Sequence, residues 1–167
     1  MKSYTVTLSE ITFEEEIKRH NQIGAIWLLY YEDIQHEYLS VIESNMVCKK
    51  EAVMDLRDIL KFNKLFSTQL IYSIGKVEKW LALIESIEMK LPLKLKVFLM
   101  LRRSLRNNRG RRGWTASIQW KFSEEYARLI KKQPEEVWIE DRNTWTRWWD
   151  KVVDYTVRVA LKNNLLD

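Results

Sequence analysis

Very few residues of this chain can interrupt a helix, because its 167 residues include only 4 glycines and 2 prolines. All-β and loop-rich folds need many tight turns, and glycine and proline make most of them. Apolar side chains recur every three or four residues through most of the chain, which is the period of an amphipathic helix. The sequence therefore predicts an all-α fold, a bundle of about six or seven helices.

The first long helix is predicted from Phe13 to about Ile42. Thr12 and Glu15 have the spacing of a capping box, in which a hydroxyl and a carboxylate satisfy free amide groups at a helix start. The helix should therefore begin there. A break is expected near Gly24, because a residue without a side chain weakens a helix. We expect one interrupted helix, or two that join near Asn21.

A second apolar stripe runs from Val53 to Ile74 and predicts another long amphipathic helix. This helix should end near Gly75, since glycine is common just after the last turn of a helix. Two long helices joined by a short polar connection can pair as an antiparallel hairpin. We assign residues 1–75 to such an N-terminal hairpin, with a role in forming a homodimer or in binding a partner protein.

Four more helices are predicted in the C-terminal half, over residues 76–90, 93–105, 114–132 and 141–161. Pro92 should open the second of them, because its ring presets the backbone angle of a first helical turn. That helix is apolar on most sides and is expected at the centre of the C-terminal core. Arg106 to Gly113 should form an exposed loop, since like charges repel and glycine weakens a helix.

Charge is unevenly distributed along the chain. Between Lys90 and Lys132 there are 13 Lys and Arg against Glu124 and Glu125, which gives a net charge of +11. Because the whole chain carries +5, the remainder has a net charge of −6. Such segregation favours a polyanion as the partner of the basic part, while the acidic remainder dimerises or holds a protein. A solvated helix face is the alternative explanation of a run of like charges.

Other classes of function lack their usual residues. A single cysteine, Cys48, with His20 and His36 far apart, provides neither a disulfide nor a zinc site. The glutamate runs at expected helix starts are explained by capping and the helix dipole. We therefore predict no enzyme, no catalytic residue, no metal and no cofactor. The sequence shows no signal peptide or membrane span, so a cytoplasmic protein without a membrane partner is expected.

The basic half can supply a helix-turn-helix-like DNA-binding domain, assigned to residues 76–167. Residues 92–103 and 114–132 would be its scaffold and supporting helices, and residues 141–161 its recognition helix. Arginine pairs with guanine and asparagine with adenine, so four side chains at the start of the last helix are expected to read bases: Arg142, Asn143, Thr146 and Arg147. Nine further cations are expected to bind phosphates: Arg102, Arg103, Arg106, Arg109, Arg111, Arg112, Lys121, Lys151 and Arg158.

Three short motifs carry a family resemblance: Lys79-Trp80 followed by Leu83-Ile84-Glu85, Leu91-Pro92 leading to Phe98 through Arg103, and Asn143 through Trp148. In this order they resemble the ArpU/RinA-like phage late-transcription regulators, whose C-terminal part is similar to the last DNA-binding region of sigma factors. The resemblance covers residues 77–161. It implies a sequence-specific regulator of phage or mobile-element promoters, bound to double-stranded DNA with host RNA polymerase nearby. Residues 133–141 exceed the short turn typical of that module.

A different class of function also accounts for the charge segregation. A small phage-encoded helical inhibitor would present the arginine-rich loop to a host protein.

The tryptophans at helical spacing, Trp80, Trp145, Trp148 and Trp149, are expected to pack in the core, because burial of a large ring stabilises a fold. Trp114 and Trp138, beside flexible segments, are better placed to contact a partner.

Overall fold

The computed structural model describes residues 8–44, 52–60, 70–107 and 111–166. Within these ranges the chain forms seven α-helices, one 3-10 helix (η1) and two short strands, which confirms the all-α class. In chain order the elements are α1 (Leu8–Leu29), α2 (Tyr31–Ser44), β1 (Val53–Asp55), α3 (Leu56–Leu60), β2 (Ile71–Ser73), α4 (Ile74–Lys90), α5 (Leu93–Ser104), α6 (Arg111–Ile130), η1 (Pro134–Val137) and α7 (Asn143–Lys162).

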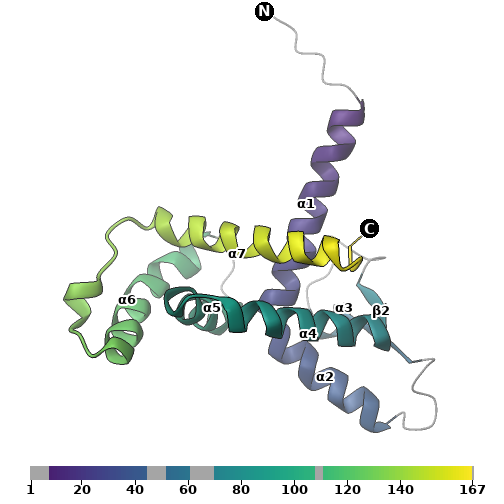
Figure 1. Cartoon of the computed structure of the whole chain (residues 1–167), viewed down its shortest axis with the longest axis horizontal. Helices are drawn as coiled ribbons and strands as arrows, with labels where there is room; N and C mark the ends of the chain where they lie inside the picture. Colours follow the sequence, from purple (N-terminus) through teal and green to yellow (C-terminus); the bar gives the residue numbers. More distant parts are fainter. Residues whose placement is uncertain (1–7, 45–51, 61–69, 108–110, 167) are drawn as a thin grey trace, which may run out of the picture.

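Two long helices, α4 and α7, lie side by side and run in opposite directions across the molecule (Figure 1). α1 crosses behind α7 and packs against it, with its N-terminal half projecting past it. α2 projects from the other side of the molecule, and α5, α6 and η1 form the end farthest from β2. α7 is therefore covered on its inner side and exposed on its outer side.

The first helical segment differs from its prediction at both its start and its break. α1 begins at Leu8, so Thr12 lies inside the helix and does not begin it. The bend falls at Tyr30, where the Tyr30 amide still donates to Ile26 O and the Ile34 amide to Tyr30 O. Gly24 lies inside α1, where an added Cβ would be 2.9 Å from Val157 Cγ2 of α7. This glycine therefore allows close helix packing and does not break the helix.

The predicted helix from Val53 to Ile74 is wrong, and so is the helical hairpin built on it. The segment contains β1, α3 and β2, and the strands pair antiparallel with Met54 opposite Tyr72. The Met54 and Tyr72 side chains are buried while their strand neighbours are more exposed, which is the alternation of a half-buried sheet. Ser73 Oγ accepts from the Lys76 amide and caps α4, so Gly75 lies in a first helical turn and not after a last one.

The C-terminal half largely confirms its prediction. α4 ends before Pro92, which is the N-cap of α5, and α6 and α7 follow within a few residues of their expected bounds. The expected loop over residues 106–113 is shorter, because α6 already begins at Arg111. Residues 108–110 of that loop lie outside the described ranges.

The core has two parts. The larger joins α1, α2, both strands, α4 and α7, and at its centre Trp27 and Trp80 stack with ring centroids 5.0 Å apart. Since these residues lie on either side of Gly75, the segments 1–75 and 76–167 share this core. The second part is an aromatic cluster of α5, α6 and α7 built around Phe98, Phe122 and Trp145. Trp114 is buried in it, so its expected contact with a partner is wrong.

Candidate nucleic-acid interface

The four side chains expected to read bases fall into two pairs on α7 and its cap. Arg142 and Thr146 are four residues apart and share one side, where Arg142 Nε donates to Gln119 Oε1 of α6 at 3.2 Å. Asn143 and Arg147 share the neighbouring side and are both exposed. Because Arg142 is directed toward α6 and Thr146 is half-buried, the four do not form one continuous row.

Asp141 organises the exposed pair. Its Oδ1 accepts from the Asn143 amide at 2.9 Å, and its Oδ2 lies 3.3 Å from Arg147 Nη2. Arg147 also donates to Thr144 Oγ1 at 3.2 Å. The Arg147–Asp141 ion pair is well exposed to water, so it holds the guanidinium only weakly. Arg147 can therefore exchange this partner for another acceptor.

Two of the arginines expected to bind phosphates are inside the protein. Arg103 is 6% exposed: its Nε donates to Leu28 O and its Nη1 to Glu88 Oε2, each at 2.8 Å. Arg102 is 7% exposed, and its guanidinium carbon lies 4.4 Å from the Trp114 ring centroid and 5.1 Å from that of Trp149. Burial lowers the pKa of Arg102 to about 10. Neither side chain is available to a polyanion, and this part of the phosphate-site prediction is wrong.

The remaining arginines of the α5–α6 segment differ in status. Arg106 is half-buried and forms an ion pair with Asp33 of α2, with Nε 2.8 Å from Oδ2. Arg109 lies outside the described residues, and so do the side chains of Arg111 and Arg112. Lys121 is exposed on α6. The structure therefore describes no exposed arginine cluster between α5 and α6.

A different basic surface lies along α4 and α7. On α7, Arg147, Lys151, Arg158 and Lys162 are spaced by four, seven and four residues, which places them on one exposed side of the helix. On α4, Lys79 and Lys90 are eleven residues apart and share a side, with Lys76 one turn before. We name these seven residues the α4–α7 basic face. Lys151 and Arg158 belong to the predicted phosphate set, whereas the α4 lysines and Lys162 were not predicted.

The α4 lysines line a groove, whereas the four α7 cations lie outside its lining. A cavity of about 620 Å³ between α4 and the end of α7 is lined by Lys79, Ser86, Lys90, Val159 and Asn163, among others. A neighbouring cavity of about 420 Å³ continues it past Lys76 to the start of α4. Lysine ammonium groups and side-chain amides therefore line the length of this groove.

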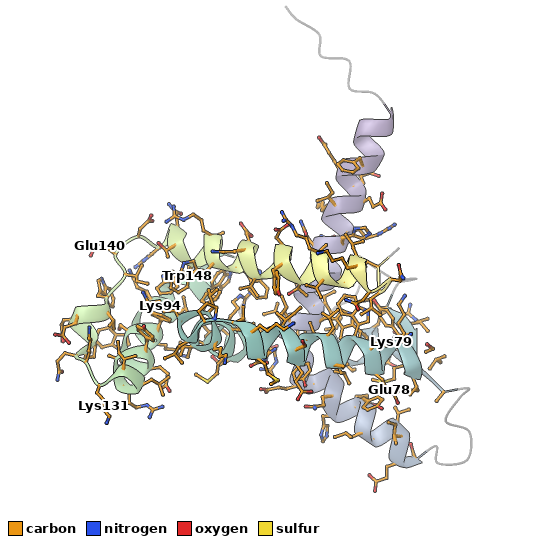
Figure 2. The ribbon with its side chains drawn as sticks, in the orientation of Figure 1. Glu78, Lys79, Lys94, Lys131, Glu140 and Trp148 are labelled. Atoms are coloured by element: carbon orange, nitrogen blue, oxygen red, sulfur yellow. The ribbon has the colours of Figure 1, made fainter. Side chains whose placement is uncertain are left out.

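Most acidic residues of the two helices lie on other sides, and Asp154 is the exception. Glu78 accepts a hydrogen bond from Tyr38 Oη of α2, and Glu88 is paired with Arg103. Figure 2 shows Glu78 on the α2 side of α4 and Lys79 near the C-terminal end of α7. On α7, Asp150 is seven residues before Val157, which contacts α1, whereas Asp154 is seven residues after Arg147 and shares the exposed cationic side. Asp154 reaches Arg158, at 3.0 Å, in an exposed ion pair.

Other kinds of site are not present in the described part of the chain. No group of three or more His, Cys, Asp or Glu side chains there could hold a metal ion. Among the described helices none is long and apolar enough to cross a membrane.

Comparison of the chain with models of protein families, with curated proteins and with solved structures found no match. The α4–α7 basic face is therefore interpreted from its own residues.

Proposed function

We propose that this protein binds double-stranded DNA through the α4–α7 basic face and acts as a sequence-specific transcription regulator. The observation that carries the proposal is the sorting of charge on α4 and α7. On α4 the lysines line the groove while Glu78 contacts α2 and Glu88 contacts the buried Arg103, and on α7 four cations share one exposed side with a single carboxylate, Asp154. A surface of one sign attracts a polyanion and holds it through many weak contacts.

The dimensions of the face suit duplex DNA. α7 has 20 residues and is about 30 Å long, close to one helical turn of B-DNA at about 34 Å. The α7 cations occur at intervals of one to two helical turns, and the α4 lysines form a parallel row across the groove. Lysine and arginine side chains in such rows contact phosphates and set the position of a protein on the duplex.

Base recognition is assigned to the start of α7. Asn143 and Arg147 are exposed there, and these residue types pair with adenine and guanine through two hydrogen bonds. Arg142 and Thr146 would support them from the side nearer α6. The resemblance to phage late-transcription regulators suggests that the target is promoter DNA, with RNA polymerase as a neighbour.

The proposed binding mode differs from that of a standard helix-turn-helix. Residues 131–142 separate α6 from α7 and include η1, whereas the turn of that motif has about three or four residues. α7 is also covered on its inner side by α1 and α4. We therefore assign the DNA contact to the outer side of α7 together with α4. A recognition helix that projects from its domain is not proposed.

A charge-reversal experiment tests this assignment. The double variant Lys79→Glu/Lys151→Glu changes one cation on each row, and Lys131→Glu/Lys132→Glu makes the same change of net charge near η1. Binding to a labelled duplex is measured by fluorescence anisotropy at several salt concentrations. We expect the first variant to bind at least about tenfold more weakly and to reduce the slope of log K against log salt by about 2. Equal loss in both variants would contradict the proposed face.

A second measurement separates base reading from phosphate binding. Selection of bound fragments from random duplexes should give a preferred sequence for the unmodified protein. Arg147→Ala should relax the preference at one or two positions, since a paired arginine–guanine contact provides about 1–3 kcal/mol of discrimination. Lys162→Ala should weaken all duplexes alike. If the selection yields no preferred sequence, the protein could still bind DNA, but the proposal of site-specific regulation would be wrong.

A further inference from the structure

Two exposed tryptophans meet at the end of the molecule formed by α6 and η1. Trp120 on α6 and Trp138, directly after η1, are 56% and 39% exposed. Their ring centroids are 5.9 Å apart and the rings are inclined at 64°. Large aromatic side chains are normally buried or partnered, so an exposed pair marks a candidate binding surface. We name Trp120, Trp138, Pro134 and Glu135 the tryptophan corner.

The corner borders an open cavity. A cavity of about 310 Å³ is lined by Trp120, Pro134, Glu135 and Trp138. Each of the two indole N–H groups lacks a hydrogen-bond acceptor within the described part of the chain. The corner therefore offers apolar ring faces together with two donors. These are the features of a site that holds an apolar ligand bearing carbonyl groups.

The backbone around the corner is held in place. Gln133 and Glu136 form a capping box at the start of η1, and Pro134 restricts the first residue of that turn. Past Trp138, the carbonyls of Ile139 and Glu140 both accept from the Gln119 side-chain amide of α6. A preformed site loses little conformational entropy when it binds a ligand.

We propose that the tryptophan corner binds a proline-rich peptide that carries a basic residue. The cavity is an open angle between two rings, in which a long flexible side chain would leave much of its surface in water. A polyproline helix is already extended, and its pyrrolidine rings pack flat on indole faces. Its carbonyls make no internal hydrogen bonds, so they are free to accept from the Trp120 and Trp138 indole N–H groups.

Charge favours a basic peptide over a nucleic acid at this site. Glu135 is one of the residues that line the cavity, and Glu124 is one turn beyond Trp120 on the same side of α6. A carboxylate beside the rings attracts Lys or Arg and repels a phosphate backbone. Lys131 and Glu140 mark this end of the molecule, which lies away from the N-terminal end of α4 and its lysines (Figure 2). The proposal therefore does not depend on DNA binding.

A peptide titration tests the proposal. The probe is a peptide of nine prolines followed by one arginine, added to the 15N-labelled chain while the signals of its 8 indole N–H groups are recorded. We expect two of the eight signals to shift in a saturable way. Trp138→Ala and Trp120→Ala should each weaken binding at least about tenfold, as for a central aromatic contact. Tyr155→Ala, which removes an exposed aromatic ring from α7, should change nothing.

Further peptides and variants separate the two parts of the proposal. A peptide with alanine in place of proline should fail to bind. Glu135→Lys should weaken the arginine-containing peptide about two- to fivefold, the range of an exposed ion pair, while Glu140→Lys leaves it unchanged. Shifts that do not saturate, or equal binding of the alanine peptide, would overturn the proposal. The same two signals responding to single-stranded oligonucleotide but not to the peptide would assign the corner to base stacking.

Discussion

The two sides of α4 carry opposite charges, and the charged side chains on the two sides differ in their partners. On the side that faces the N-terminal helices, Glu78 is bonded to Tyr38 and Glu88 to Arg103. On the side that borders α7, Lys79 and Lys90 line a groove. The first set of charges has partners on other helices of the fold, and the second borders a groove that is open to other molecules. Charge in this molecule therefore has two roles that cannot be told apart by counting residues.

Two adjacent buried residues of α5, Arg102 and Arg103, also differ in their partners. Arg103 has a carboxylate, a carbonyl oxygen and the Tyr31 ring as partners. Arg102 lies between two indole rings and donates to Leu105 O, without a carboxylate partner within the described residues. A buried cation is stable only if interactions with the protein offset the loss of its hydration. Arg103 has more such interactions than Arg102. Their variants should differ accordingly.

Arg103→Met is expected to have the largest effect. It removes two hydrogen bonds and leaves Glu88 and Leu28 O without their partner, so the free energy of unfolding should fall by about 2–4 kcal/mol. Urea denaturation followed by circular dichroism measures this fall. Glu88→Gln, which keeps a hydrogen-bond acceptor beside Arg103, is the matched control and should lose less than half as much. A loss under about 1 kcal/mol for Arg103→Met would mean that Arg103 does not hold α5 to α1 and α4.

Lys79→Ala/Lys90→Ala should show the opposite behaviour. Both side chains border the groove and are exposed, so the free energy of unfolding should stay within about 0.5 kcal/mol of the unmodified value. Affinity for duplex DNA should fall by about tenfold at low salt because two phosphate contacts are lost. Anisotropy and urea denaturation on the same samples compare the two quantities. A clear loss of stability would place these lysines among the charges that the fold uses.

Arg102→Met is expected to change stability by no more than about 1 kcal/mol. The substitution loses contact between a cation and two rings, but it also removes a buried charge whose pKa is lowered to about 10 by burial. Methionine fills similar space and packs well on aromatic rings. Urea denaturation beside Arg103→Met gives the comparison directly. A loss equal to that of Arg103→Met would show that stacking on Trp114 and Trp149 compensates the charge as fully as a carboxylate does.

Local sequence patterns predicted the C-terminal helices well because each pattern is complete within one element. Pro92 separates α4 from α5, and apolar spacing defines α6 and α7. The strands were missed because three-residue strands leave no periodic signal, and Met54 pairs with Tyr72 across an intervening helix. Gly24 was misinterpreted for a similar reason. Its role depends on Val157, which is far away in the sequence.

The candidate site shows the same limit. Summing charge from Lys90 to Lys132 gave equal weight to every cation, although Arg102 and Arg103 point inward from α5. Lys76 and Lys79 lie outside that window, and Lys90 was counted in the sum but was not assigned to the phosphate-binding set. Sorting each helix by side would have found Lys79 and Lys90, since eleven residues are close to three helical turns. The burial of Arg102 and Arg103 could be recognised only from the packed structure.

The smallest expected effect concerns Tyr38 and Glu78, on the side of α4 that faces α2. Burial, with the hydrogen bond to Glu78, raises the pKa of Tyr38 from 10.0 to about 12. Below pH 10 the tyrosine is protonated in both the folded and the unfolded chain, so its contribution to stability is fully present. Between pH 10 and 12 the unfolded chain loses this proton first, and stability falls with rising pH. Tyr38→Phe should cost about 0.5–1 kcal/mol at pH 7, and that difference should disappear by about pH 12. Urea denaturation of both proteins at several pH values measures it; a difference that stays constant to pH 12 would contradict the Tyr38–Glu78 bond, whereas Tyr155→Phe, on the exposed side of α7, should show no such dependence.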